Sequence, residues 1–229
     1  MKGIAYCVGV GPGDPELMTQ KAVRLIREND VIAVPGKVAK ESAAYRIALA
    51  MIPELENKEL VPVHMPMIYD REMIEPEHEK AAKLLESYLD KGKNVVYITL
   101  GDPSVYCTFS YIQRILVKDG YSVELVPGVT SFCAAAARLN IPLAEWDESL
   151  HILPAAHKTN EDFNQSGTYV LMKSGKNISK VKDIIRHSGR DIYSIENCGM
   201  ADEKIYGNVD EIPDDAGYFT LIVAKERRE

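Results

Sequence analysis

Val8-Gly9-Val10-Gly11-Pro12-Gly13-Asp14-Pro15-Glu16 is the stretch around which the rest of the chain is arranged, and it continues an apolar strand over residues 4–8. Its three glycines give the backbone access to positive φ angles and let other groups come close. Pro15 suits a first helical turn, with Asp14 as its N-cap. A strand, a glycine loop and a helix in this order predict a ligand-binding turn.

This loop does not match the common phosphate-binding motifs. Its glycines read Gly9-x-Gly11-x-Gly13 rather than G-x-G-x-x-G, and no Gly-Lys-Ser/Thr follows. The carboxylates of Asp14 and Glu16 would repel a phosphate at close range. Two interpretations therefore stay open ahead of phosphate binding: a purely structural turn, and a site for a cationic or zwitterionic ligand.

Composition narrows the class of protein. The chain has 229 residues, of which 46% are hydrophobic and 27% charged, as in a globular enzyme. A net charge of −7 argues against nucleic-acid binding. No apolar run approaches the ~20 residues of a membrane span, and the start of the chain reads as a strand rather than a signal peptide, so we expect a cytoplasmic protein.

The metal-ligating residue types are scattered along the chain. The cysteines show no C-x-x-C spacing and the histidines no ligand spacing, so no protein-bound metal is expected and the thiols are expected to be reduced. The residues concerned are Cys7, Cys107, Cys133 and Cys198, with His64, His78, His151, His157 and His187. His64 follows a strand within the segment His64-Met65-Pro66-Met67, which makes it the histidine of most interest.

Apolar periodicity predicts two domains with different architectures. Strands at 4–8, 31–34, 60–63, 95–100 and 123–126 alternate with helices at 16–29, 42–52, 76–91 and 105–118. This alternation predicts an α/β domain over 1–128 with a mostly parallel five-stranded sheet. The almost wholly apolar strand 95–100 is expected at the centre of that sheet.

The second domain, residues 129–229, is expected to be smaller and of α+β type. After a helix at 130–139, short strands are predicted at 150–153, 168–172, 192–196, 204–209 and 218–224, with one helix at 178–187. The fold class is thus α/β with two αβα domains, the second with a mixed or antiparallel five-stranded sheet.

Three glycine-bearing loops follow strands of the first domain. They are the opening loop, Gly101-Asp102-Pro103-Ser104, and Pro127-Gly128-Val129-Thr130-Ser131. Ligands of parallel sheets bind beyond the carboxyl ends of the strands, so we expect these loops to line one cleft. Asp102 could equally serve only to shape a turn, and Ser131 could equally serve only as a helix cap, instead of binding a ligand. Met172, taken alone, is expected only to fill space in the hydrophobic core.

The motifs together resemble a known family. They are residues 8–17, Gly101-Asp102-Pro103, Val126-Pro127-Gly128-Val129-Thr130-Ser131, Leu171-Met172-Lys173 and Tyr218-Phe219-Thr220-Leu221. In this combination they are similar to those of the tetrapyrrole (class III) methyltransferases, which use S-adenosylmethionine (SAM). The resemblance runs the length of the chain and implies the tetrapyrrole methylase fold, a tetrapyrrole substrate and a homodimer.

Within that family, two segments resemble the enzymes that methylate C20 of precorrin-2 or cobalt-factor II in cobalamin (vitamin B12) biosynthesis. They are His64-Met65-Pro66-Met67 followed by Asp70-Arg71, and Gly101–Tyr106 followed by Thr108, Phe109 and Tyr111. Whether the ring already carries cobalt is left open. The alternatives are another tetrapyrrole methylase, such as uroporphyrinogen III C-methyltransferase, a non-catalytic SAM- or nucleotide-binding module, and a nicotinamide-dependent enzyme.

The resemblance also implies site residues. SAM is expected in a cleft between the two domains, with the first domain holding the substrate and the second completing the SAM site. The implied SAM contacts are Leu100, Gly101, Asp102, Val105, Thr130, Ser131, Met172, Gly199 and Thr220. The residues expected to bind substrate are Gly11, Pro12, Lys37, His64 and Arg71.

The chemistry requires a proton acceptor and a partner for the substrate carboxylates. Asp14 is the first candidate for the general base, because it projects from a loop at the expected cleft, and Tyr106 is the second. A tetrapyrrole bears many carboxylates, so we expect a local basic rim despite the acidic total charge. Its expected members are Lys37, Arg46 and Arg71.

Overall fold

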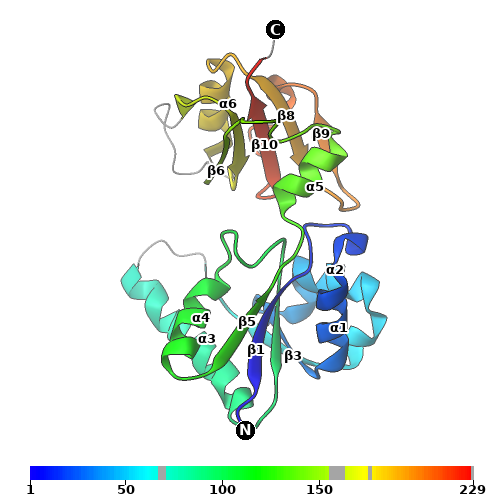
Figure 1. The fold of residues 1–229 in the computed structure, drawn as a ribbon, viewed down its shortest axis with the longest axis vertical. Coiled ribbons are helices and arrows are strands. Elements are labelled where there is room, and N and C mark those ends of the chain that lie inside the picture. Colours follow the sequence, from blue (N-terminus) through cyan, green and yellow to red (C-terminus); the bar gives the residue numbers. More distant parts are fainter. Residues whose placement is uncertain (67–70, 155–162, 175–176, 228–229) are drawn as a thin grey trace. The chain divides into compact units, whose positions relative to one another are not determined.

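The chain folds into two compact units, Met1–Thr130 and Ser131–Glu229. The computed structural model describes residues 1–66, 71–154, 163–174 and 177–227. Each unit is built around one five-stranded sheet (Figure 1). Within these described ranges, no helix is both long and apolar enough to cross a membrane.

The sheet of the N-terminal unit is entirely parallel. It contains β1 (Ile4–Gly9), β2 (Val31–Pro35), β3 (Glu59–Val63), β4 (Val95–Thr99) and β5 (Ser122–Val126), in the order β3-β2-β4-β1-β5. The prediction that the apolar fourth strand is central is confirmed. Helices cover both faces of this strand, so its side chains are buried in both directions.

Four α-helices flank this sheet. The helices α1 (Gln20–Glu28) and α2 (Ala43–Met51) lie on one side, and α3 (Arg71–Leu89) and α4 (Phe109–Lys118) on the other (Figure 1). Alternate residues of each strand point to opposite faces. The face toward α3 and α4 forms a core that includes Ala5, Cys7, Val95, Tyr97, Leu85, Leu89, Ile112 and Leu116.

The first predicted helix is divided in two. A 3-10 helix, η1 (Pro15–Leu17), follows the opening loop, and the Asp14 side chain accepts a hydrogen bond from the Glu16 N–H at 2.9 Å. The predicted cap at Asp14 is therefore confirmed. The α-helix itself begins only after Thr19, whose hydroxyl accepts from the Ala22 N–H at 3.2 Å, because Met18 is in an extended conformation.

Two further helix starts were predicted wrongly. Pro76 lies inside α3 rather than at its start. Proline removes one backbone hydrogen bond from the helix. Burial of Ala81, Leu85 and Leu89 stabilises the helix despite this loss. Helix α4 begins at Phe109 rather than Val105. Tyr106 has φ +49°, which no residue of a right-handed helix adopts.

The C-terminal unit contains the predicted mixed sheet. Its strands are β6 (Leu150–Pro154), β7 (Thr168–Met172), β8 (Asp191–Glu196), β9 (Lys204–Tyr206) and β10 (Thr220–Lys225), in the order β6-β7-β10-β8-β9. Among the strands that the structure describes in this unit, only the β6–β7 pair is parallel. Helix α6 (Ile178–Arg186) packs on Tyr169, Leu171 and Ile222, while α5 (Ser131–Arg138) lies against β10.

A buried ion pair holds the segment before β6 onto this sheet. The Lys225 ammonium donates to the Pro142 carbonyl at 2.8 Å and lies 3.3 Å from Glu148 Oε2. The Thr168 hydroxyl donates to Glu148 Oε1 at 2.6 Å. Burial raises the pKa of Glu148, but the hydrogen bonds from Thr168 and Lys225 outweigh it and leave the pKa below its ordinary value.

We predict that Lys225→Met destabilises the C-terminal unit, because it leaves the Glu148 carboxylate buried without its cation. Removing one partner of a buried ion pair costs about 3–5 kcal/mol of unfolding free energy. Urea denaturation followed by circular dichroism measures the loss. The control is Arg227→Met, which breaks the exposed pair with Asp191, worth about 0–1 kcal/mol. Equal losses in the two variants would contradict the prediction.

Candidate functional site

The carboxyl ends of β1, β4 and β5 bring the three glycine loops into direct contact. The Gly101 N–H donates to the Gly11 carbonyl at 2.8 Å. A Cβ atom on Gly9 would lie 2.4 Å from the Gly101 carbonyl oxygen, and one on Gly128 would lie 2.1 Å from the same oxygen. No side chain fits at either position, so these glycines are needed for close backbone approach.

Asp102 ties two of these loops together. One carboxylate oxygen accepts hydrogen bonds from the N–H (2.8 Å) and the hydroxyl of Ser104, and the other accepts from the Gly128 N–H at 2.9 Å. The bond from the Ser104 N–H confirms that Asp102 shapes a turn. The bond from the Gly128 N–H also links Asp102 to a loop 26 positions further along the chain. Burial raises the pKa of Asp102, but the bonds from Ser104 and Gly128 outweigh it and lower the pKa overall.

The two candidate bases differ in their surroundings. Asp14 is half-buried, and the bond from the Glu16 N–H occupies only its Oδ1 atom. Tyr106 is 43% exposed and sits in the left-handed backbone region at φ +49°. A non-glycine residue in that region costs about 1–3 kcal/mol and is typical of ligand-binding segments. Both side chains can therefore contact a ligand, but they are not hydrogen-bonded to one another in the described part of the chain.

Two predicted cofactor residues carry buried hydroxyls that lack a partner. Thr130 Oγ1 and Thr220 Oγ1 are both inaccessible to solvent and make no hydrogen bond within the described structure. A buried hydroxyl without a partner costs about 1–3 kcal/mol. Such groups are expected where a ligand completes the bonding. Leu100, Val105 and Ser131 are half-buried.

The predicted residues of the C-terminal unit gather at one end of its sheet. Glu196, at the end of β8, lies opposite Thr220 at the start of β10. Leu171 lies opposite Ile222, which puts Met172 at the same end. Gly199 follows β8 with φ +76° and donates its N–H to Glu203 Oε2 at 2.8 Å.

Two residues at this end were not predicted as special. Lys173 and Asn197 both have positive φ angles, +57° and +53°, although neither is glycine. Each comes directly after a strand, β7 and β8 respectively. The sequence offers little signal for such strain, since of these two residue types only Asn is enriched in this conformation.

The expected substrate-binding residues lie mainly beyond strand ends of the N-terminal unit. Gly11 and Pro12 are buried, and Lys37 and His64 are exposed after β2 and β3. The Gly36 N–H donates to the Val63 carbonyl at 2.9 Å, so the segments carrying Lys37 and His64 are adjacent.

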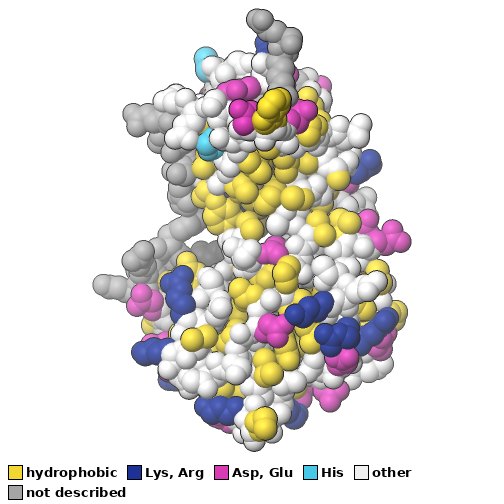
Figure 2. Space-filling view, in the orientation of Figure 1, with side chains coloured by type: hydrophobic (Ala, Val, Ile, Leu, Met, Phe, Trp, Pro, Cys, Tyr) yellow, Lys and Arg dark blue, Asp and Glu magenta, His cyan; other side chains and the backbone are white. Residues whose placement is uncertain are grey.

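The predicted basic rim stays a prediction, because only part of it lies within the described residues. Arg46 is exposed on α2, whereas the side chain of Arg71, like Met67 and Asp70, lies outside the described residues. Figure 2 shows Lys and Arg side chains interspersed with Asp and Glu over the N-terminal unit. On the described part of that face no patch of one sign stands out.

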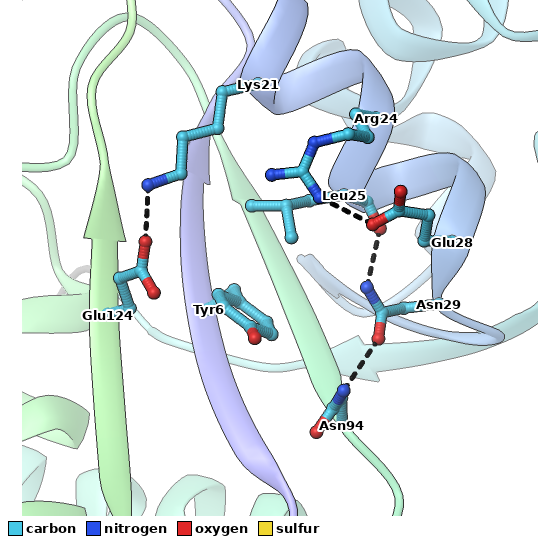
Figure 3. Close-up of a pocket in the computed structure, with 8 residues that line it drawn as sticks. All are labelled: Tyr6, Lys21, Arg24, Leu25, Glu28, Asn29, Asn94 and Glu124. Atoms are coloured by element: carbon cyan, nitrogen blue, oxygen red, sulfur yellow. Dashed lines mark hydrogen bonds and ion pairs between the residues drawn. The ribbon is translucent and has the colours of Figure 1, made fainter.

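A separate hollow of about 450 Å³ lies beside α1, away from the glycine loops (Figure 3). Sequence reasoning did not identify it. Its polar side chains bond to one another, as Lys21 does to Glu124 and Arg24 to Glu28. The Asn94 amide donates to Asn29 Oδ1 at 3.0 Å. With these groups already paired, the hollow offers a ligand little unmet bonding.

Comparison with known proteins agrees with the loop motifs. The family model described as Tetrapyrrole (Corrin/Porphyrin) Methylases matches residues 5–213. A probable cobalt-precorrin-2 C(20)-methyltransferase of Methanocaldococcus jannaschii is 38% identical over 96% of this chain and 95% of its own length. The cobalt-precorrin-2 C(20)-methyltransferase of Salmonella typhimurium is 30% identical over 100% and 99%.

Solved structures share the fold. The native uroporphyrin III C-methyltransferase of Thermus thermophilus aligns with a TM-score of 0.72 and 27% identity over 98% of each chain. A structure of that enzyme complexed with S-adenosylhomocysteine aligns with a TM-score of 0.69 and 24% identity, again over 98% of each chain.

We predict that Asp102→Asn loosens the loops in a pH-dependent manner. The amide retains the size of the side chain but replaces one acceptor oxygen with an NH2 donor, which then faces either the Ser104 donors or the Gly128 N–H. Because the folded-state pKa of Asp102 is lowered, its stabilising contribution is present above the ordinary pKa of about 3.9 and disappears as pH falls through the folded value. The melting temperatures of wild type and variant should therefore converge between about pH 5 and pH 2.

The matched control is Asp30→Asn, since Asp30 is exposed. That variant should melt like the wild type across the same series. The same difference in melting temperature between wild type and Asp102→Asn at every pH would show that the charge of the carboxylate does not contribute to stability.

Proposed function

Because the chain belongs to the family of tetrapyrrole (corrin/porphyrin) methylases, we propose that it transfers a methyl group from SAM to carbon C20 of precorrin-2 or its cobalt complex in cobalamin biosynthesis. The observation that carries the substrate is the end-to-end similarity, at 38% and 30% identity, to two proteins named for that reaction.

The residues present fit SAM as co-substrate. The glycine loops leave a backbone surface without side chains at Gly9 and Gly128. The buried hydroxyls of Thr130 and Thr220 have no hydrogen-bond partner among the described residues, and a ligand with amine, carboxylate and hydroxyl groups would supply one. We propose that the SAM contacts are Leu100, Gly101, Asp102, Val105, Thr130, Ser131, Met172, Gly199 and Thr220.

The protein's first task is orientation. SAM supplies an electrophilic methyl group on a sulfonium centre, and an electron-rich ring carbon needs only correct alignment and exclusion of water. Holding two reactants in line can contribute about 7–11 kcal/mol to lowering the barrier. Asp102 serves this by fixing the Gly101 loop to Gly128, a bond within the fold that does not depend on substrate.

The second task is to accept the proton that leaves the methylated carbon. We propose Asp14 as the acceptor, since its carboxylate is half-buried and, among the described residues, only its Oδ1 atom is hydrogen-bonded. Tyr106, in the strained Gly101–Thr108 segment, is the alternative. Asp102 is less suited, because hydrogen bonds to both of its oxygens stabilise the charged form.

Cationic and polar groups beyond β2 and β3 are proposed to bind the substrate. Lys37 and His64 are exposed on adjacent segments, and Arg46 and Arg71 complete the proposed set. Gly11 and Pro12 form buried backbone next to Gly101. Such a local arrangement would attract the acetate and propionate groups of a tetrapyrrole although the whole chain carries a net charge of −7.

We also propose a cytoplasmic homodimer. Exposed apolar surface supports the association of two copies. Trp146 is fully exposed, and Figure 2 shows apolar side chains gathered over the C-terminal unit. Large exposed apolar patches mark interaction sites. Sedimentation velocity at micromolar concentration tests this assembly, and a single monomeric species would contradict it.

The decisive assay incubates the protein with SAM and either precorrin-2 or its cobalt complex. We expect the pigment to gain the mass of one methyl group, located at C20 by NMR, with S-adenosylhomocysteine as the second product. Uroporphyrinogen III serves as the control substrate. Methylation of uroporphyrinogen III alone would reassign the enzyme within the family, and SAM binding with no methylation of any ring would favour a binding module.

Asp14→Asn separates the proposed base from the structural cap. Asn caps a helix about as well as Asp, so the η1 turn should persist while proton acceptance is lost. We expect kcat to fall by about 10²–10⁴-fold with the dissociation constant for SAM unchanged, measured by calorimetry. Glu16→Gln, next to it and exposed, is the control. Full turnover by Asp14→Asn would remove it from the mechanism and make Tyr106→Phe the next variant.

A further inference from the structure

The carboxylate of Glu196 is buried at the same end of the C-terminal sheet as Thr220. Glu196 is the last residue of β8, stands opposite Thr220 of β10 and is only 8% exposed. No step of the proposed methyl transfer uses this carboxylate. Because burying a carboxylate is costly unless hydrogen bonds satisfy its oxygens, the partners of Glu196 indicate what it does.

Both oxygens of Glu196 are hydrogen-bonded. Oε1 accepts from the Gly217 N–H at 2.7 Å, and Oε2 accepts from the Tyr206 hydroxyl at 2.6 Å. Burial, followed by the hydrogen bond with Glu196, raises the pKa of Tyr206 to about 12, so the phenol keeps its proton and donates at physiological pH. The carboxylate therefore joins the end of β8 to β9 and to the segment that leads into β10.

The bond to Gly217 leads directly to Thr220. The Gly217 carbonyl accepts from the Thr220 N–H at 3.1 Å, which closes a turn over residues 217–220. A Cβ atom on Gly217 would lie 2.6 Å from Glu196 Oε1, so a glycine is needed for the carboxylate to approach. The adjacent backbone bond, from the Asn197 N–H to the Phe219 carbonyl, is longer at 3.4 Å. Glu196 thus supplies the shorter, charge-assisted anchor of the turn.

This turn carries side chains suited to a ligand. The Thr220 hydroxyl is buried and has no hydrogen-bond partner among the described residues. Tyr218 and Phe219 are exposed and pack edge to face, with ring centroids 5.4 Å apart. Ligand sites combine aromatic surface with a few placed polar groups, and the turn over residues 217–220 provides both.

We propose that Glu196 is a positioning residue for SAM, which acts by holding the turn over residues 217–220 in the conformation that presents the Thr220 hydroxyl. The proposal rests on the proposed function, because it takes SAM as the ligand of Thr220. If the turn adopts other conformations, the apparent dissociation constant rises, since it equals the intrinsic constant divided by the fraction of protein that is competent to bind.

Two replacements separate the reach of Glu196 from its charge. Glu196→Gln keeps the length of the side chain. Its carbonyl oxygen can accept from the Gly217 N–H while its NH2 group donates to the Tyr206 hydroxyl oxygen. Glu196→Asp keeps the charge but is one methylene shorter, so it cannot span both partners. A positioning role requires reach, and an electrostatic role requires charge.

The test is calorimetric titration of SAM into the full chain. We expect Glu196→Asp and Glu196→Ala to raise the dissociation constant about tenfold or more, and Glu196→Gln to stay within about threefold of wild type. The control is Asp191→Asn, exposed at the other end of β8, which should bind SAM like the wild type. Wild-type affinity in Glu196→Asp, or affinity lost in Glu196→Gln and kept in Glu196→Asp, would overturn the proposal.

A double-mutant cycle with Thr220→Val tests whether Glu196 acts through the Thr220 hydroxyl. All variants are measured at a temperature at which circular dichroism shows them to be folded. In the Thr220→Val background, Glu196→Asp should weaken SAM binding little further, because coupled residues do not have additive effects. The full loss in both backgrounds would indicate a general structural defect and overturn the proposed route.

Hydrogen exchange of the SAM-free protein tests the turn itself. The amides of Gly217 and Thr220 should exchange faster in Glu196→Asp than in the wild type, since the anchor no longer suppresses local opening. Amides of α6 serve as the internal control. Equal exchange in the two proteins would overturn the proposed role of Glu196, whereas a wild-type protein that does not bind SAM would instead refute the proposed function.

Discussion

The close backbone contact among Gly9, Gly101 and Gly128 is the constraint on which the rest of the site depends. Any Cβ at Gly9 or Gly128 would overlap the carbonyl of Gly101. Because β1 lies between β4 and β5 in a parallel sheet, the three strands deliver their loops to one edge. The absence of side chains at the contact leaves backbone groups for ligand recognition and lets the Asp102 carboxylate span the gap to Gly128.

The polar groups near the strand ends of each unit divide into those that hold the fold and those left for chemistry. Asp102 has both oxygens bonded within the protein, so its charge is used to fix the loops. Asp14 has one oxygen occupied by the cap. Within the described residues, the Thr130 hydroxyl of the N-terminal unit is buried without a partner, and so is the Thr220 hydroxyl of the C-terminal unit. These unsatisfied groups favour a polar ligand, as a tetrapyrrole methylase requires.

Much of the architecture was predictable because burial imposes a regular pattern. The apolar run of β4 predicted its central place, and Asp14 before Pro15 predicted the cap of η1. The errors lie where local signals were outweighed. Pro76 suggested a helix start, yet packing of the α3 stripe carries the helix past it. The segment 105–108 was predicted to be helical, but the turn held by Asp102 and the positive φ of Tyr106 prevent it.

The sequence by itself determined the alternation of strands and helices, the glycines at the strand exits and the resemblance to the methylase family. These depend on side-chain type and spacing along the chain. Only the tertiary structure decided that Asp102 bonds to Gly128, and that the described residues leave the hydroxyls of Thr130 and Thr220 without hydrogen-bond partners. The physical reason is that such contacts join residues far apart in the chain, and sheet register and loop geometry, which no local pattern encodes, set their distances.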